Sequence, residues 1–145
     1  MKTIEICGKQ YEVECNALTY VKYKSFFKTG ILKDMQFIEN YLIKQTIVSQ
    51  KLAEKKLTEE EKASQLSSYM IDDTDEFVVK ITQLAWILIY SANNKVEEYD
   101  KWLKSIEKFN VSDNWIAEVA ELAVDCFCWW RIIQRTRKTK QQKYI

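Results

Sequence analysis

The sequence predicts a mainly α-helical protein: a compact domain of about five or six helices with a short N-terminal β-hairpin. Three observations favour this class. The chain contains no proline and only two glycines among its 145 residues, so little interrupts its helix-forming stretches. Apolar and polar residues alternate clearly only before residue 16. Beyond that point apolar residues recur every three or four positions, which is the period of an amphipathic helix.

The hairpin is expected in residues 3–15. Apolar side chains occupy alternate positions in both strands: Ile4, Ile6, Tyr11, Val13 and Cys15. The stretch Gly8-Lys9-Gln10 lies between the strands and is expected to connect them. Because an isolated hairpin is only marginally stable in water, its apolar face must rest on the helices that follow.

The first two helices are expected to lie on either side of Gly30. Asn16 is placed to cap a first helix running to about Lys28, which Gly30 would end. Its expected inward side chains are Leu18, Val21 and Phe26 or Phe27. The second helix is expected from about Lys33 to Lys55. Its stripe comprises Met35, Ile38, Tyr41, Leu42, Gln45, Val48 and Leu52.

The segment between residues 53 and 76 is rich in charge. Thr58 and Glu61 fit a capping box, so a short polar helix is expected to about Met70. The acidic stretch "DDTDE" would then begin the next helix, because carboxylates favour the positive end of a helix dipole. A mobile connector over the same residues is the alternative.

The fourth helix, from Phe77 to Asn93-Asn94, is expected at the centre of the fold because it is apolar nearly all round. Its most apolar window is about a dozen residues, well short of the roughly 20 that span a bilayer. A fifth helix would present Val96, Tyr99, Trp102, Leu103, Ile106 and Phe109 on one stripe. A last helix would start at Ser112-Asp113 and complete a helical body over residues 16–135 of a single domain.

The residue types favour a binding protein over an enzyme. Histidine is absent, which removes the commonest general base near neutral pH and the commonest metal ligand. The chain has no glycine-rich phosphate loop, and its acidic clusters lack the spacing of a calcium loop. We therefore expect no enzymatic activity, no cofactor and no small-molecule substrate.

The four cysteines are expected to be reduced thiols. The amino terminus lacks the apolar run of a secretory signal, so the cytoplasm is the expected compartment. Cys126 and Cys128 would point to opposite sides of one helix, and Cys7 and Cys15 to opposite faces of the hairpin. Neither pair can hold one metal ion. A cysteine-based metal or redox protein remains an alternative hypothesis.

The last helix carries two apolar stripes. The first would dock the helix on the body: Ile116, Val119, Ala120, Ala123, Phe127 and Trp130. The second comprises Trp115, Leu122, Trp129 and Ile132. Either neighbouring helices cover this second stripe, or Trp129 and Ile132 stay exposed for a partner.

Positive charge is concentrated at the carboxyl terminus. Residues 131–145 carry six basic residues and no acidic one, whereas the remaining 130 residues carry 16 basic and 21 acidic ones. We expect residues 136–145 to form a basic, mobile tail. The segment is either a solvated end or a contact for an acidic protein surface or nucleic acid. The candidate partner-binding residues are Trp115, Leu122, Trp129, Arg131, Ile132, Arg135, Arg137 and Lys138.

Two parts of the chain carry a resemblance to a known family. "IEICGKQYEVECNALTYVKYKSFFKTG" combines a hairpin with a G-K-x-Y turn and a tyrosine-rich first helix. It resembles the tail assembly chaperones of tailed phages and of prophages in Gram-positive bacteria. "TQLAWILIYSANN" and "WIAEVAELAVDCF" are similar in character to the helical body of those proteins.

The resemblance implies a non-enzymatic role in the host cytoplasm. A protein of this family binds the long tape-measure protein, keeps its apolar helices soluble and helps to recruit tail-tube subunits. Self-association into a homo-oligomer is left open. The alternative is a small helical nucleic-acid-binding or regulatory protein that uses the basic C-terminal tail, although an acidic body disfavours nucleic acid as a partner.

Overall fold

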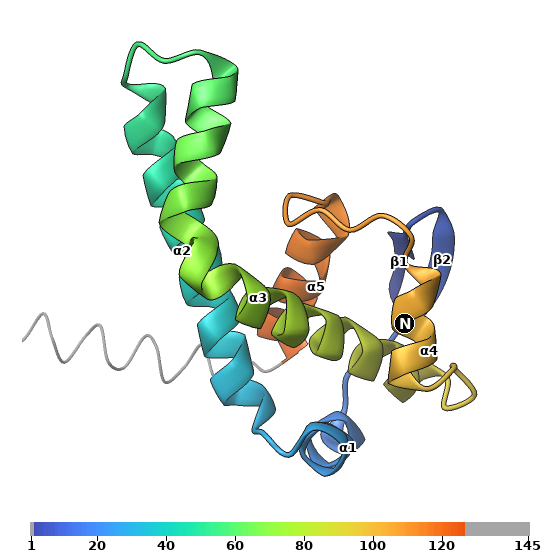
Figure 1. The fold of residues 1–145 in the computed structure, drawn as a ribbon. Coiled ribbons are helices and arrows are strands. Elements are labelled where there is room, and N and C mark those ends of the chain that lie inside the picture. Colours follow the sequence, from blue (N-terminus) through green and yellow to red (C-terminus); the bar gives the residue numbers. More distant parts are fainter. Residues whose placement is uncertain (1, 127–145) are drawn as a thin grey trace, which may run out of the picture.

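The structure is a computed structural model, and it describes residues 2–126 (Figure 1). A two-stranded antiparallel hairpin, β1 (Lys2–Ile6) and β2 (Lys9–Val13), opens the chain. Five helices follow in these residues: α1 (Ala17–Phe27), α2 (Ile31–Ala53), α3 (Glu59–Ala92), α4 (Tyr99–Ser105) and α5 (Asn114–Cys126). The predicted fold class, mainly α with a short hairpin at the amino terminus, is confirmed. The predicted end of the last helix and the basic tail lie outside the described residues.

The hairpin closes through a tighter turn than predicted. Cys7 and Gly8 form a two-residue connection, and both have positive φ angles, 52° and 80°. Positive φ at both turn positions matches the twist of the flanking strands. Lys9 therefore pairs with Ile6 inside the sheet and is not part of the connection. The predicted apolar face is confirmed for the buried Ile4, Ile6 and Val13, while Tyr11 is half-buried: β1 contacts α5 and β2 contacts α3.

Helix α1 begins at the predicted cap but buries a different face. The Asn16 side chain accepts a hydrogen bond from the backbone N–H of Leu18, and the Asn16 N–H donates to the Thr19 hydroxyl. Leu18 and Val21 are 47% and 65% exposed, so their inward assignment is wrong. The buried positions are Thr19 and Tyr23. The Thr19 hydroxyl lies 2.7 Å from the Ser91 hydroxyl of α3, and the Tyr23 hydroxyl donates to the Asp34 carboxylate of α2.

Helix α1 ends about where predicted, but Lys28 closes it in place of Gly30. Lys28 adopts the left-handed conformation that closes the helix, with φ 65°. Gly30 instead precedes the first turn of α2, which begins at Ile31 and not at Lys33. Phe27 is half-buried and Phe26 is 46% exposed, so of these two rings Phe27 faces further inward.

Helix α3 is continuous through the segment where two helices, or a mobile connector, were predicted. Thr58 caps it as expected, accepting a hydrogen bond from the Glu61 N–H. The stretch "DDTDE" lies inside the helix and not at a helix start. Figure 1 shows that α3 changes direction near its middle. Thr74 is close to the middle of α3 in the sequence, and its hydroxyl donates to the Met70 carbonyl at 2.8 Å. Such a contact often bends a helix.

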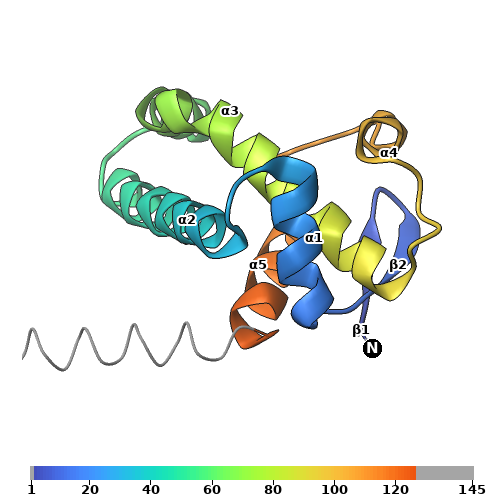
Figure 2. The same cartoon turned by 90° about the horizontal axis from the view of Figure 1, so that it is seen from below.

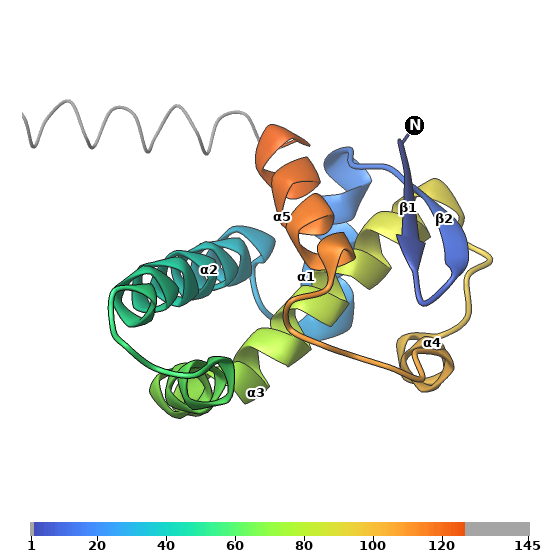
Figure 3. The same cartoon turned by 90° about the horizontal axis from the view of Figure 1, so that it is seen from above.

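The core surrounds the carboxyl half of α3. Helix α1 crosses this half (Figure 2), α5 packs beside it (Figure 3), and α4 and β2 also contact it. Helix α2 pairs with α3 along its length, and the two form an arm that projects from the body (Figure 1). Helix α4 is shorter than the predicted stripe from Val96 to Phe109. Within residues 2–126, no helix is both long enough and apolar enough to cross a membrane.

The structure corrects the expectation for two of the cysteines. Cys15 and Cys126 form a disulfide across 111 residues of sequence, with their Cα atoms 6.1 Å apart. The expectation of reduced thiols rested on a cytoplasmic compartment, and the geometry of the cysteines was compared only within one element. The disulfide partners come from opposite ends of the described chain. Both residues are partly buried and pack against the core. Cys7 is a free, exposed thiol, and Cys128 lies outside the described residues.

Candidate functional site

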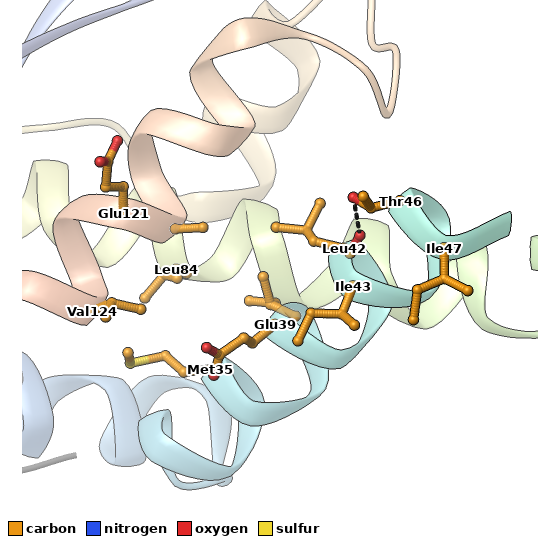
Figure 4. Close-up of a pocket in the computed structure, with 11 residues that line it drawn as sticks. Met35, Glu39, Leu42, Ile43, Thr46, Ile47, Leu84, Glu121 and Val124 are labelled. Carbon is orange, nitrogen blue, oxygen red and sulfur yellow. Dashed lines mark hydrogen bonds between the residues drawn. The ribbon is translucent and has the colours of Figure 1, made fainter. Parts of the chain in front are cut away.

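The candidate site is an apolar groove between α2 and α5, and we call it the α2–α5 groove. It has a volume of about 430 Å³. Its lining side chains are Met35, Ile38, Glu39, Leu42, Ile43, Thr46, Ile47, Leu84, Ala120, Glu121 and Val124. Figure 4 shows Leu42 of α2, Leu84 of α3 and Val124 of α5 directed into the space between the helices.

The groove exposes apolar surface that the fold does not use. Ile43 is 51% exposed and Ile47 is 45% exposed, and they lie one helical turn apart on the α2 wall. Leu84 is buried and forms the floor. Contiguous exposed apolar surface of this kind marks an interaction site more often than scattered single residues do. The groove can therefore bury the apolar face of another chain.

The charged side chains that line the α2–α5 groove are acidic. Glu39 and Glu121 stand on opposite walls, on α2 and α5, and no basic side chain is present among the described residues that line it. Glu121 is exposed and Glu39 is half-exposed. An apolar segment flanked by lysine or arginine would complement these walls better than one flanked by acidic residues.

A second hollow of about 600 Å³ continues the groove toward the tip of the arm. It shares Leu42 and Thr46 with the α2–α5 groove and adds Leu66 of α3 and Ile116 of α5. Its mouth includes polar side chains, among them Gln45 and Ser49. The two hollows together offer one side of α2 for contact from Met35 to Ala53, a rise of roughly 27 Å along the helix.

A buried polar cluster holds the start of α2, and with it the groove wall, against α1 and α3. The Lys80 ammonium lies 2.6 Å from one Asp34 carboxylate oxygen. The other oxygen accepts hydrogen bonds from the Tyr23 hydroxyl at 2.6 Å and the Thr29 hydroxyl at 2.7 Å. Both carboxylate oxygens are therefore occupied, so this cluster is a structural anchor and offers no free ligand.

The pKa values of the cluster reflect these contacts. Burial alone would raise the pKa of Asp34, but hydrogen bonds from Lys80, Tyr23 and Thr29 outweigh it and the pKa is lowered. Burial would lower the pKa of Lys80, but the Asp34 and Glu76 carboxylates outweigh it and the pKa is raised. Burial, followed by the hydrogen bond to Asp34, raises the pKa of Tyr23. The cluster is charged and paired at neutral pH.

The structure places two of the predicted partner-binding residues. Trp115 is 4% exposed and packs edge to face on Phe109 at 5.9 Å, so its side chain belongs to the core. Leu122 is half-buried and packs against the core. The other six lie outside the described residues, and their role stays a prediction: Trp129, Arg131, Ile132, Arg135, Arg137 and Lys138.

Sequence reasoning missed the groove wall. The predicted stripe of α2 included Leu42 but not Ile43 or Ile47, which lie on the adjacent face. Two isoleucines four residues apart, outside a stripe that already docks the helix, were the available signal. Within residues 2–126, no group of three or more cysteine, aspartate or glutamate side chains is arranged to hold a metal ion.

Comparisons with known proteins do not assign the chain to a family. The search with protein-family models gives no match, and neither the curated proteins nor the solved structures contain a match to this sequence or fold.

Proposed function

We propose that this protein is a non-enzymatic tail assembly chaperone that holds an apolar helical segment of a phage tape-measure protein in the α2–α5 groove. The observation that carries the proposal is the exposed apolar wall formed by Ile43 and Ile47 beside the Leu84 floor. The sequence resemblance supplies the identity of the client. Help in recruiting tail-tube subunits belongs to the same proposal.

The groove dimensions suit a helical client. From Met35 to Ile47 the α2 wall rises roughly 18 Å, which matches about three turns of a bound helix. A helix lying in such a groove inserts apolar side chains spaced three or four residues apart. A tape-measure protein is long, helical and apolar, so it supplies many such segments. Shielding them needs surface and shape and requires no reaction centre.

The test is co-expression with the tape-measure protein of the same phage, followed by measurement of the soluble complex. Ile43→Asp combined with Ile47→Asp places two charges on the groove wall without altering a buried side chain. We expect this double variant to lose the soluble complex, because unpaired carboxylates would be buried against the client. The isolated variant should keep the wild-type circular dichroism spectrum.

A matched control comes from the outer face of α1. Leu18 and Val21 are exposed to a similar degree and lie one turn apart, but they do not line the groove. Leu18→Asp combined with Val21→Asp should leave the complex intact. Equal loss in both double variants, or no loss in either, would contradict the proposal. If the purified protein instead retains nucleic acid, and a modest rise in salt concentration releases it, the nucleic-acid-binding alternative is favoured.

A further inference from the structure

Another pocket lies away from both hollows, where α1, α3 and α4 meet, and we call it the aromatic pocket. Its volume is about 670 Å³. Five rings line it: Phe26, Phe27, Trp86, Tyr90 and Tyr99. They lie edge to face or tilted, with centroids 5.1 Å apart for Phe26 and Trp86 and 5.2 Å apart for Phe27 and Tyr99. Aromatic faces are negative at their centres and attract cations.

Hydrogen bonds fix the rings in place. The Trp86 indole N–H donates to the Glu97 carbonyl at 2.9 Å, and the Tyr99 hydroxyl lies 2.8 Å from the Thr82 hydroxyl oxygen. Trp86 is nearly buried, whereas Phe26 is 46% exposed. The pocket is therefore a preformed surface, with Phe26 at its edge and Trp86 at its base.

The charge beside these rings is entirely negative. Glu98 and Asp100 line the pocket, and both are exposed. Glu98 makes no capping hydrogen bond to α4, so its carboxylate is not used by that helix. No lysine or arginine is present among the described residues lining the pocket. Rings and carboxylates together select a guanidinium or ammonium group.

We propose that the aromatic pocket binds an arginine side chain from the basic segment of the same chain, residues 131–145. Charge complementarity supports this occupant, because the segment carries six basic residues and no acidic one. Arginine is favoured over lysine because its planar guanidinium stacks on rings and pairs with carboxylates in the same plane. The inference does not rest on the chaperone role.

The point of attachment brings the segment within reach. The disulfide places Cys126 beside Cys15, with Cα atoms 6.1 Å apart, at the amino end of α1. Phe26 lies at the other end of α1, roughly 16 Å further on. Arg135 follows Cys126 by nine residues, which can extend to about 30 Å. The segment that follows Cys126 is therefore long enough for its arginines to reach the aromatic pocket of the same chain.

Nuclear magnetic resonance of the full chain can test the contact through the Trp86 indole N–H signal. Replacing Arg131, Arg135 and Arg137 together by Gln should shift this signal, since the cation leaves the pocket. The matched control replaces Lys138, Lys140 and Lys143 by Gln, an identical charge change, and should leave the signal in place. High salt should shift the wild-type signal toward that of the arginine variant.

Variants of the pocket complete the design. Glu98→Gln combined with Asp100→Asn should shift the Trp86 indole signal. Adding the three arginine replacements to this double variant should not shift the signal further. Glu54→Gln with Glu60→Gln, two exposed carboxylates on the arm, serves as the control. Equal shifts from the lysine and arginine variants, additive shifts in the combined variant, or no shift at all would overturn the proposal. A wild-type signal that depends on protein concentration would also overturn it, because the arginine would then come from a second copy.

Discussion

Residues 59–76 and residues 77–92 belong to one helix, α3, yet their surroundings differ. In the first half only Met70 is buried, and the helix pairs with α2 along the projecting arm (Figure 1). In the second half the buried side chains are Phe77, Ile81, Thr82, Leu84, Ala85, Trp86, Ile87, Leu88 and Ile89. The second half is thus the centre of the core, while the first half mainly extends the surface.

The same contrast separates two ion pairs that both join α2 to α3. Asp34 and Lys80 lie 2.6 Å apart in the body, with side chains 3% and 13% exposed. Lys44 and Asp73 lie 3.2 Å apart on the arm, 46% and 41% exposed. Water screens the arm pair, but the body pair has lost most of its hydration and depends on its partners. The comparison teaches that α2 is anchored near its start and more loosely toward its tip.

The largest expected effect comes from the disulfide, which joins the connection between β2 and α1 to the end of α5 and involves no part of the arm. Replacing Cys15 and Cys126 together by Ser should lower the free energy of unfolding by about 4 kcal/mol, because the closed loop is long. Urea unfolding of the oxidised protein measures the difference. Cys7→Ser, at an exposed free thiol, should change little. An unchanged midpoint in the double variant would show that the disulfide does not constrain the chain.

Next in size is the difference between the two halves of α3. Leu88→Ala removes a fully buried side chain and should cost roughly 3 kcal/mol. Leu66→Ala is the same chemical change on the arm, where the side chain is only partly buried, and should cost about 1 kcal/mol. Urea midpoints of the two variants provide the measurement. Equal losses would mean that the arm belongs to the cooperative core as fully as the body does.

Local sequence signals predicted most of this architecture because they act over a few residues. Alternation located the hairpin, Asn16 and Thr58 located two helix starts, and the apolar character of residues 77–92 located the core. The same reasoning placed a helix start at "DDTDE", because carboxylates favour that position. The helix is continuous there, with Met70 and Phe77 buried in the core on either side of the stretch. Their contacts with other elements cannot be read from the local sequence pattern.

The candidate site was harder to predict because it depends on packing between distant elements. The α2–α5 groove exists because α5 covers only part of α2, which leaves Ile43 and Ile47 uncovered. In the sequence, Asp34 is an acidic residue in the first turn of a helix, which is a common position for a carboxylate. Its ion pair with Lys80 could not be predicted, because the two residues are 46 positions apart. The disulfide joins residues 111 apart. Spacing within one element carries no information on such pairs.

A smaller effect should separate the two ion pairs. Asp34→Asn removes the closer of the two carboxylates that pair with Lys80 in the described residues and leaves Glu76 at 3.4 Å. The change should cost about 2 kcal/mol. Asp73→Asn on the arm should cost no more than about 0.5 kcal/mol, because that pair is solvated. Thermal or urea unfolding at neutral pH compares the two variants. A loss at Asp73 as large as that at Asp34 would break the distinction between anchored and loose parts of α2.

The smallest expected effect is the pH dependence of the stability lost in Asp34→Asn. Because the pKa of Asp34 is lowered in the folded protein, its contribution is complete above its ordinary pKa of 3.8 and is lost as pH falls through the folded value. The gap in unfolding free energy between wild type and Asp34→Asn should therefore narrow as the pH is lowered from 5 toward about 2. Asp73→Asn, which removes the solvated ion pair on the arm, serves as the comparison variant. A gap at Asp34 that stays constant over this range would mean that the carboxylate gains nothing from Lys80, Tyr23 and Thr29.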